Sequence, residues 1–72
     1  MPKHQIMDQS GHSEHVWDQA DVVSMAEAER RFAELTGRGF RAVALGPDGG
    51  TILKGFDPTV ETTLFIPNLM GG

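Results

Sequence analysis

The chain has 72 residues, 39% hydrophobic and 22% charged, which fits one small folded domain and argues against wholesale disorder. Six Lys and Arg against ten Asp and Glu give a net charge of −4, so the basic balance that nucleic-acid binding needs is missing. Cysteine is absent, which excludes disulfides, thiolate metal ligands and thiol nucleophiles. The sequence shows neither a secretory signal pattern nor an apolar run of about 18 residues, so we expect a cytoplasmic monomer that does not bind membranes.

The N-terminal residues 4–17 predict a β-hairpin. Their centre, Asp8-Gln9-Ser10-Gly11, has turn-forming residues at the positions that a type I turn favours. Short apolar pairs flank this turn on both sides, and they supply the contacts that would hold the two arms together. Polar residues interrupt the alternation, so the pattern leaves open whether Ile6 or Met7 faces the core.

The following segment, residues 21–36, predicts an α-helix. Apolar residues recur there at steps of three, four and three, which places them on one helical face: Met25, Ala28, Phe32 and Leu35. Two N-caps compete, Ser24 at the start of a capping-box sequence and Asp21. We expect Gly37 or Gly39 to end the helix, because glycine adopts the left-handed cap conformation at little cost.

A second hairpin is predicted in the C-terminal half. Residues 40–45 and 51–56 are short apolar runs, and the turn-rich sequence Gly46-Pro47-Asp48-Gly49-Gly50 joins them. This loop contains glycines but lacks the Lys-Ser/Thr of a phosphate-binding loop, so we interpret it as a turn. Pro58 ends the second strand, because it restricts the preceding residue and has no amide donor.

The last elements complete an α+β fold. Residues 58–62 are expected to form one helical turn, and residues 63–66 a final strand that stops pairing at Pro67. One helix would then cover a four- to five-stranded mixed sheet. We therefore expect a domain at 1–67 and a flexible tail at 68–72. The expected core consists of Met25, Phe32, Leu35, Val43, Leu53, Leu64 and Ile66.

Large aromatic residues are expected mostly in this core, as is usual for Trp and Phe. Phe65 is the candidate for exposure. If it lies on the outer face of the sheet together with Val43, the two would form a docking surface for another protein.

Candidate catalytic and metal-binding residues are sparse. Histidines and carboxylates near the N-terminus could be interpreted as a metal site, but solvated polar positions explain them more simply: His4, Asp8, His12, Glu14 and His15. Asp57 precedes a proline and suits a turn better than a general base. The chain shows no assembly of nucleophile, base and pocket, so we expect neither an enzyme nor a metal site.

The C-terminal sequence carries a resemblance to a known superfamily. Phe65-Ile66-Pro67-Asn68-Leu69-Met70-Gly71-Gly72 resembles the F-x-P-x-x-x-G-G ending of thiamine and molybdopterin sulfur carriers and of bacterial ubiquitin-like modifiers. The predicted order of elements likewise resembles the β-grasp fold of ubiquitin. Unlike eukaryotic ubiquitin, the tail has no basic residue after Lys54, which favours the bacterial types.

The resemblance implies that the Gly72 carboxylate is adenylated by an E1-like enzyme, which uses ATP while this chain holds no cofactor. Gly71 and Gly72 would thread a narrow channel, with Pro67, Leu69 and Met70 as recognition contacts. The activated end would be joined to a target protein, with an E2-like protein and a deconjugating protease as further partners. Two alternatives stay open: a sulfur carrier that forms a C-terminal thiocarboxylate, and a non-covalent β-grasp interaction module.

Overall fold

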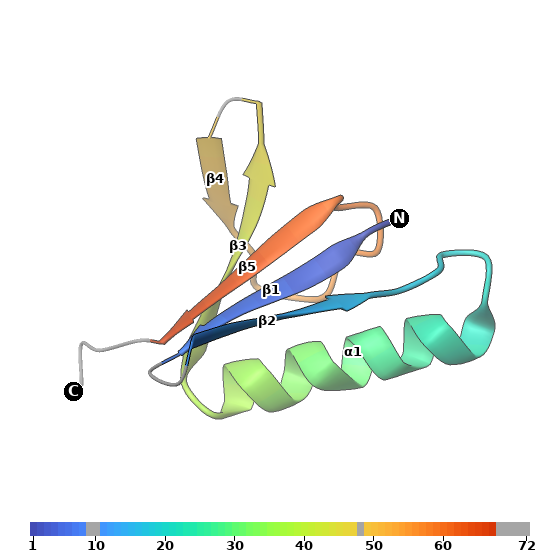
Figure 1. Cartoon of the computed structure of the whole chain (residues 1–72), viewed down its shortest axis with the longest axis horizontal. Helices are drawn as coiled ribbons and strands as arrows, with labels where there is room; N and C mark the ends of the chain where they lie inside the picture. Colours follow the sequence, from blue (N-terminus) through green and yellow to red (C-terminus); the bar gives the residue numbers. More distant parts are fainter. Residues whose placement is uncertain (9–10, 48, 68–72) are drawn as a thin grey trace.

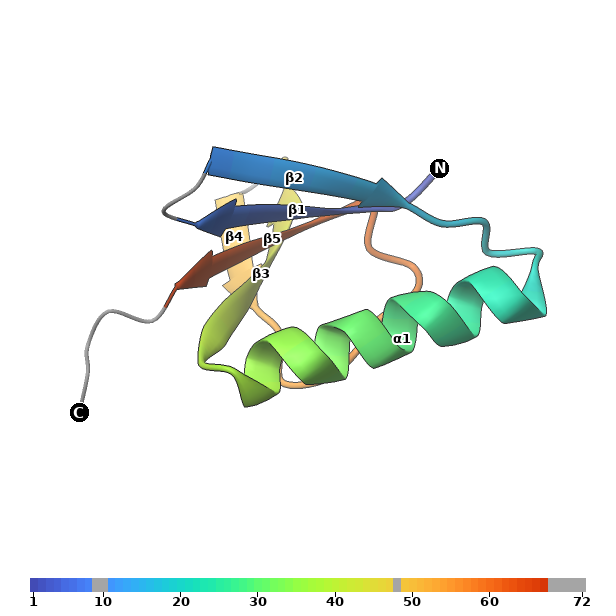
Figure 2. The same cartoon turned by 60° about the horizontal axis from the view of Figure 1, so that its bottom comes forward.

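The computed structural model describes residues 1–8, 11–47 and 49–67, and within them one helix packs on a five-stranded mixed sheet. The chain is therefore α+β, as predicted. Figures 1 and 2 show the two layers, with the helix lying along one face of the sheet. In chain order the elements are β1 (Lys3–Asp8), β2 (Gly11–Val16), α1 (Val22–Gly37), β3 (Phe40–Gly46), β4 (Gly49–Ile52) and β5 (Thr62–Pro67).

The strands lie in the order β2-β1-β5-β3-β4. β1 pairs in parallel with β5, and the other neighbours are antiparallel. The last strand is therefore inserted between the two hairpins, beside the first strand. Because β5 runs in the direction of β1, it ends at the opposite end of the sheet from the N-terminus (Figure 1).

Asp21 is the N-cap of α1. Its backbone is extended, with φ −106° and ψ 113°, and its Oδ1 accepts hydrogen bonds from the amides of Val23 at 3.0 Å and Ser24 at 3.4 Å. The alternative cap at Ser24 is wrong, because the Ser24 hydroxyl instead accepts a hydrogen bond from the Asp18 amide at 2.9 Å. The helix ends at Gly37, and Gly39 provides the positive φ of 97° that turns the chain into β3.

Replacing Asp21 with alanine should therefore destabilise the fold by about 1 kcal/mol, since two amides of the first turn lose their acceptor. Asp21→Asn keeps a capping oxygen and is the matched control. The free energy of unfolding in urea measures both variants. Equal stability of Asp21→Ala and the wild type would show that the cap contributes nothing.

The core lies between α1 and the inner face of the sheet, the face that α1 covers. Ala28, Phe32 and Leu35 of the helix are buried, as their spacing predicts, while Met25 is only half-buried. Ala28 at 0% and Ala42 of β3 at 1% exposure are small side chains that let the helix approach the sheet closely. The buried cluster consists of Ile6, Phe32, Leu35, Ala42 and Phe65, with Phe40, Leu53 and Phe56 packed against it.

The prediction for the two faces of β5 is wrong. Phe65, expected to be exposed, has 0% exposure, whereas Leu64 is half-buried and Ile66 is 40% exposed on the opposite, outer face. Residues 64–66 are all apolar, so their pattern does not specify which face is buried. The pairing with β1 decides it, because Phe65 lies beside Ile6 and shares its inward face.

The boundaries of two later segments also differ from the prediction. β4 covers Gly49–Ile52 instead of residues 51–56, and Leu53 reaches the core beyond the strand end, with its amide bonded to the Ala42 carbonyl at 2.9 Å. In place of a helical turn at 58–62, the Asp57 carboxylate accepts hydrogen bonds from the amide and hydroxyl of Thr59. Asp57 is thus a turn residue, as expected.

Candidate functional site

The strand that leads to the predicted conjugation site is β5. Gly71, Gly72, Met70 and Leu69 lie outside the described residues, so their assigned roles stay predictions. β5 is paired with β1 on one side and with β3 on the other, and its final residue, Pro67, lies opposite Phe40 of β3. Pro67 is therefore the last residue that the structure places in the sheet.

Phe65 fixes β5 against the helix. Its ring lies 5.6 Å from Phe32 of α1 and 4.9 Å from His4 of β1, measured between ring centroids. A side chain with 0% exposure in the central strand cannot take part in docking, so the predicted role of Phe65 in a docking surface is corrected to that of a core residue. Phe65 therefore packs β5 against the helix two residues before Pro67.

The outer face of the sheet, which α1 does not cover, carries a group of aliphatic side chains. Val43 pairs with Ile52 on one side and with Leu64 on the other, so these three side chains form a row across β4, β3 and β5. Ile52 is 58% exposed, while Val43 and Leu64 are half-buried. Two flanking residues complete this set, which we call the outer aliphatic group: Val43, Leu45, Ile52, Leu64 and Ile66.

The prediction of Val43 in the core is therefore wrong, because the side chain is half-buried on the outer face. This is the face that the predicted docking surface required, and the role of Val43 in docking stays a prediction. Gly50 of β4 leaves room for it, since a β-carbon built at Gly50 would lie 2.6 Å from Val43 Cγ1. The sequence pattern did not indicate that Leu64 and Ile52 belong to this surface. Alternation along β5 would identify Leu64 once Phe65 is assigned to the core, whereas Ile52 follows only from the register with Val43.

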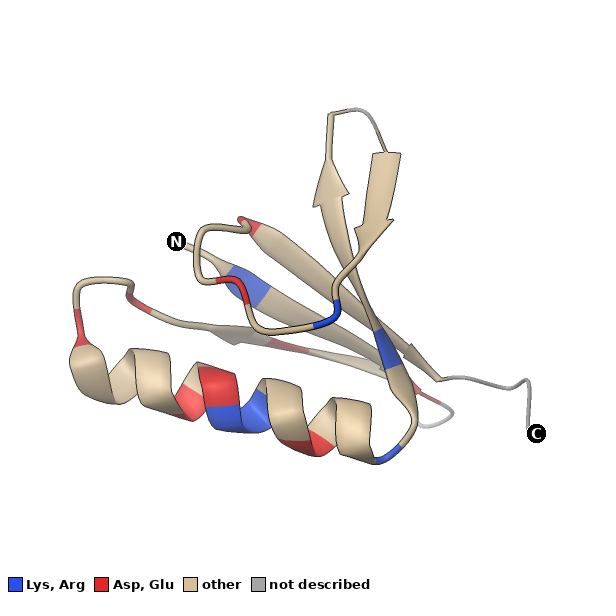
Figure 3. Cartoon of the chain, turned by 180° about the vertical axis from the view of Figure 1, so that it is seen from behind, with Lys and Arg blue, Asp and Glu red and all other residues tan. Residues whose placement is uncertain are grey.

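The same face becomes polar towards β1 and β2. Gln5 Nε2 donates to Glu14 Oε2 at 2.9 Å, and Lys3 Nζ lies 3.8 Å from the same oxygen. The Gln5 hydrogen bond, followed by the Lys3 charge, lowers the pKa of Glu14 from its ordinary value, so the carboxylate is charged at neutral pH. Five charged side chains lie on α1 (Figure 3), and Arg41 of β3, which is exposed and lies opposite Ile66, is a charged neighbour of the outer aliphatic group.

His4 was expected at a solvated polar position, and this expectation is wrong, because the side chain is buried. It has 0% exposure, its ring centroid is 4.4 Å from that of Trp17, and neither ring nitrogen has a hydrogen-bond partner in the described part of the chain. Burial first, then the charges of Arg31 and His15, lower its pKa from 6.5 to about 4. His4 is therefore neutral at physiological pH and closed to substrates.

The N-terminal histidines and carboxylates do not converge. His4 faces the core, whereas His12 and Glu14 occupy the outer face of β2, as the register with β1 requires. Among the residues that the structure describes, no group of three or more His, Asp or Glu side chains could hold a metal ion.

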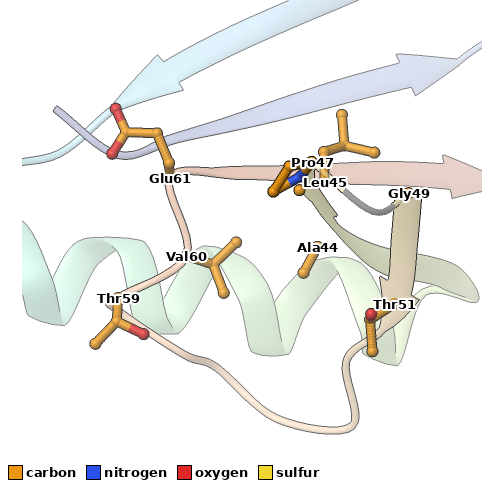
Figure 4. A pocket seen from close by; sticks show the side chains of 9 residues that line it. Ala44, Leu45, Pro47, Gly49, Thr51, Thr59, Val60 and Glu61 are labelled. Carbon is orange, nitrogen blue, oxygen red and sulfur yellow. The ribbon is translucent and has the colours of Figure 1, made fainter.

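A hollow of about 370 Å³ lies between the β3–β4 hairpin and residues 59–61 (Figure 4). Ala44 and Val60 contribute apolar walls, and Thr51 and Thr59 contribute hydroxyl groups. Glu61 is the one titratable residue among the described residues that line it, and its carboxylate lies 3.6 Å from the N-terminal amine. The charged side chain of the hollow is therefore already paired with an amine, and we assign the hollow no chemical role.

Within residues 1–8, 11–47 and 49–67, no helix is long and apolar enough to cross a membrane. Comparison with known proteins adds no identity: no family model, no curated protein and no solved structure matches the chain.

Proposed function

We propose that this chain is a small ubiquitin-like modifier with a β-grasp fold. Its Gly72 carboxylate is adenylated by an E1-like enzyme and then joined to a target protein. The observation that carries the proposal is the position of β5, which is held between β1 and β3 and ends at Pro67, five residues before Gly72 in the sequence. A folded body thus precedes a short, uncharged sequence that ends in Gly71-Gly72.

The order of strands supports the β-grasp assignment. Two antiparallel hairpins, β1–β2 and β3–β4, flank a final strand that runs parallel to the first, and one helix crosses their inner face. In a fold of this kind the last strand lies in the middle of the sheet, between two neighbouring strands. The strand is therefore fixed on both sides when another protein pulls on the residues that follow it.

The chemistry at Gly72 needs only a carboxylate, whether native or exposed by processing. The ionised carboxylate attacks the α-phosphate of ATP and releases pyrophosphate, which leaves a mixed anhydride between Gly72 and AMP. A thiol or amine then attacks the Gly72 carbonyl carbon and AMP leaves. Because glycine has no β-carbon, Gly71 and Gly72 can enter an active site too narrow for other residues.

The outer aliphatic group supplies the surface by which the modifier would be held. Ile52, Ile66 and Leu45 are exposed beside the half-buried Val43 and Leu64, all on the face opposite the helix. Exposed aliphatic side chains clustered on a sheet face favour contact with another protein. Docking on this face would leave α1 uncovered and residues 68–72 available to the enzyme.

An adenylation assay tests the proposal. The full chain is incubated with ATP and an E1-like enzyme encoded by the same genome, and the acyl-adenylate or thioester is detected by intact mass. We expect activation of the wild type and its loss when Gly72 is deleted. Gly55→Ala is the matched control, because a β-carbon at Gly55 meets no atom within 4 Å and should leave activation unchanged.

The same mass measurement separates the alternatives. A sulfur carrier isolated from its native host would show one oxygen of the terminal carboxylate replaced by sulfur, without target adducts. A non-covalent module would show neither change, and it would keep its partner after removal of Leu69 to Gly72. An unaltered wild-type mass with each E1-like enzyme of that genome would overturn the proposed activation.

A further inference from the structure

The edge strand β2 is exposed along its whole length. All six residues, Gly11–Val16, are exposed, and the pairing with β1 is one-to-one from Lys3 opposite Val16 to Asp8 opposite Gly11. Natural edge strands are usually protected by charged side chains, especially lysine, by proline, by a bulge or by a very short length. β2 contains neither proline nor lysine, its pairing is regular, and its charged side chain, Glu14, is held by Gln5 and Lys3 of β1, so its outer edge can accept another strand.

The opposite edge of the sheet is less suited to pairing. β4 has four residues, Gly49–Ile52, of which two are glycines. Glycine weakens a strand because it carries no side chain to pack across the pair, and a four-residue strand offers few hydrogen bonds. The edge that can extend the sheet is therefore β2 (Figure 1).

We propose that β2 pairs antiparallel with β2 of a second copy of this chain, about a two-fold axis at Ser13, to form a reversible dimer with a continuous sheet. The inference goes beyond the proposed function and does not depend on Gly72. It replaces the monomer expected from the sequence.

The two-fold symmetry restricts the register. In an antiparallel pair, opposed residues have their side chains on the same face of the sheet, and side chains alternate between the two faces along each strand. With a two-fold axis, each residue must therefore lie opposite a residue of the partner copy whose number is the same or differs by an even number. With the axis at Ser13, His12 of each copy lies opposite Glu14 of the other. An axis at Glu14 would instead place two carboxylates opposite each other, which is unfavourable.

The side chains on the outer face fit this register. Both Gln5 and Lys3 contact Oε2 of Glu14, so Oε1 is the carboxylate oxygen that these two contacts do not use. An imidazole can donate a hydrogen bond to this oxygen in its neutral or its charged form. The symmetry repeats the contact, so the dimer contains two His12–Glu14 pairs.

The inner face leaves room for the pairing. Ser13 and His15 of β2 point to the face of the sheet on which α1 lies, yet both residues are exposed. The helix therefore does not cover β2. Figure 2 shows α1 of one chain along one face of its sheet. In the dimer both helices lie on that same side of a continuous sheet, with the two uncovered β2 strands between them. The two β2 strands are about 4.8 Å apart, and each helix lies beyond the β2 strand of its own copy. The two helices therefore stay clear of each other.

Sedimentation of the full chain over a concentration series up to about 1 mM tests the proposal. We expect concentration-dependent dimers, weak because a single pair of edge strands is a small interface. His12→Glu places a carboxylate opposite Glu14 of the partner in both symmetry-related pairs and should weaken association by about tenfold or more. The matched control Thr51→Lys alters the other edge and should leave association unchanged. Circular dichroism verifies that each variant is folded.

A mixing experiment tests the register itself. The acidic variant His12→Glu and the basic double variant His12→Lys/Glu14→Lys should each be monomeric alone and should form a heterodimer when mixed at equal concentration. A wild type that stays monomeric up to about 1 mM would overturn the proposal. So would a dimer that His12→Glu leaves unchanged, or the absence of a heterodimer from the two folded variants.

Discussion

Phe65→Ala should leave most of the chain unfolded in the absence of denaturant. The side chain has 0% exposure and contacts both the helix and β1, with Phe32 at 5.6 Å and His4 at 4.9 Å between ring centroids. Truncating a buried phenylalanine to alanine costs about 3 to 5 kcal/mol. A domain of this size has a total stability of about the same magnitude, so the variant has little or no margin left.

The neighbouring residue provides the control. Ile66→Ala alters an aliphatic side chain that is 40% exposed on the outer face, and it should cost about 1 kcal/mol or less. Urea unfolding followed by far-UV circular dichroism compares the two variants. If Ile66→Ala proved the more damaging, the assignment of the inner and outer faces of β5 would be wrong.

Stability should fall by roughly 2 kcal/mol as the pH is lowered from 7 to 5, because His4 is neutral when folded and protonated when unfolded. Its pKa is about 4 in the folded chain and 6.5 as the ordinary value. Between these values the unfolded chain binds the additional proton, so stability is greatest above pH 6.5 and decreases towards pH 4. The pKa values of Glu14 and Asp57 are lowered from ordinary values of 4.5 and 3.8, so these carboxyl groups change the stability at pH below those values, outside the range from pH 7 to 5.

His4→Phe should remove this pH dependence. The substitution keeps an aromatic ring beside Trp17 and Phe65, and it eliminates two buried nitrogens that lack hydrogen-bond partners among the described residues. Equilibrium unfolding of the wild type and the variant at pH 7, 6 and 5 gives the two slopes. A His4→Phe variant with the full wild-type slope would show that His4 is not the responsible group.

Local patterns predicted the elements of this fold. The helical period of Met25, Ala28, Phe32 and Leu35 placed α1 to within one residue at each end, since a 3.6-residue repeat occurs in no other regular element. The prediction left the N-cap open between Asp21 and Ser24. Both have the right chemistry, and only the backbone conformation at Asp21 decides between them.

The faces of the strands could not be predicted in the same way. In β3 the inward residue Ala42 is small and the outward residue Val43 is larger, the reverse of what hydrophobicity alone favours. The close approach of α1 through Ala28 explains this choice, and it is a tertiary effect. His4 was likewise not predicted in the core, because its burial depends on an aromatic environment drawn from four distant segments: Trp17, Phe32, Phe56 and Phe65.

The candidate site was predicted in part. The glycines of the C-terminal sequence and the predicted stop at Pro67 are local features, and Pro67 is the last described residue of β5. The central position of β5, which makes it a support fixed on both sides, depends on pairing with β1 about sixty residues away in sequence. The outer aliphatic group likewise requires the register of three strands. Neither the central position of β5 nor the outer aliphatic group can be predicted from a short stretch of sequence.

Peptide mass spectrometry of proteins from the native host tests the central claim most directly. Lys54 is the last basic residue, so trypsin would leave residues 55–72 of this chain attached to a target through Gly72. We predict target peptides that carry this remnant on a side-chain amine. Purified chain with a thiocarboxylate or an unmodified carboxylate at Gly72, and no such remnant on any target, would contradict the assignment as a protein modifier.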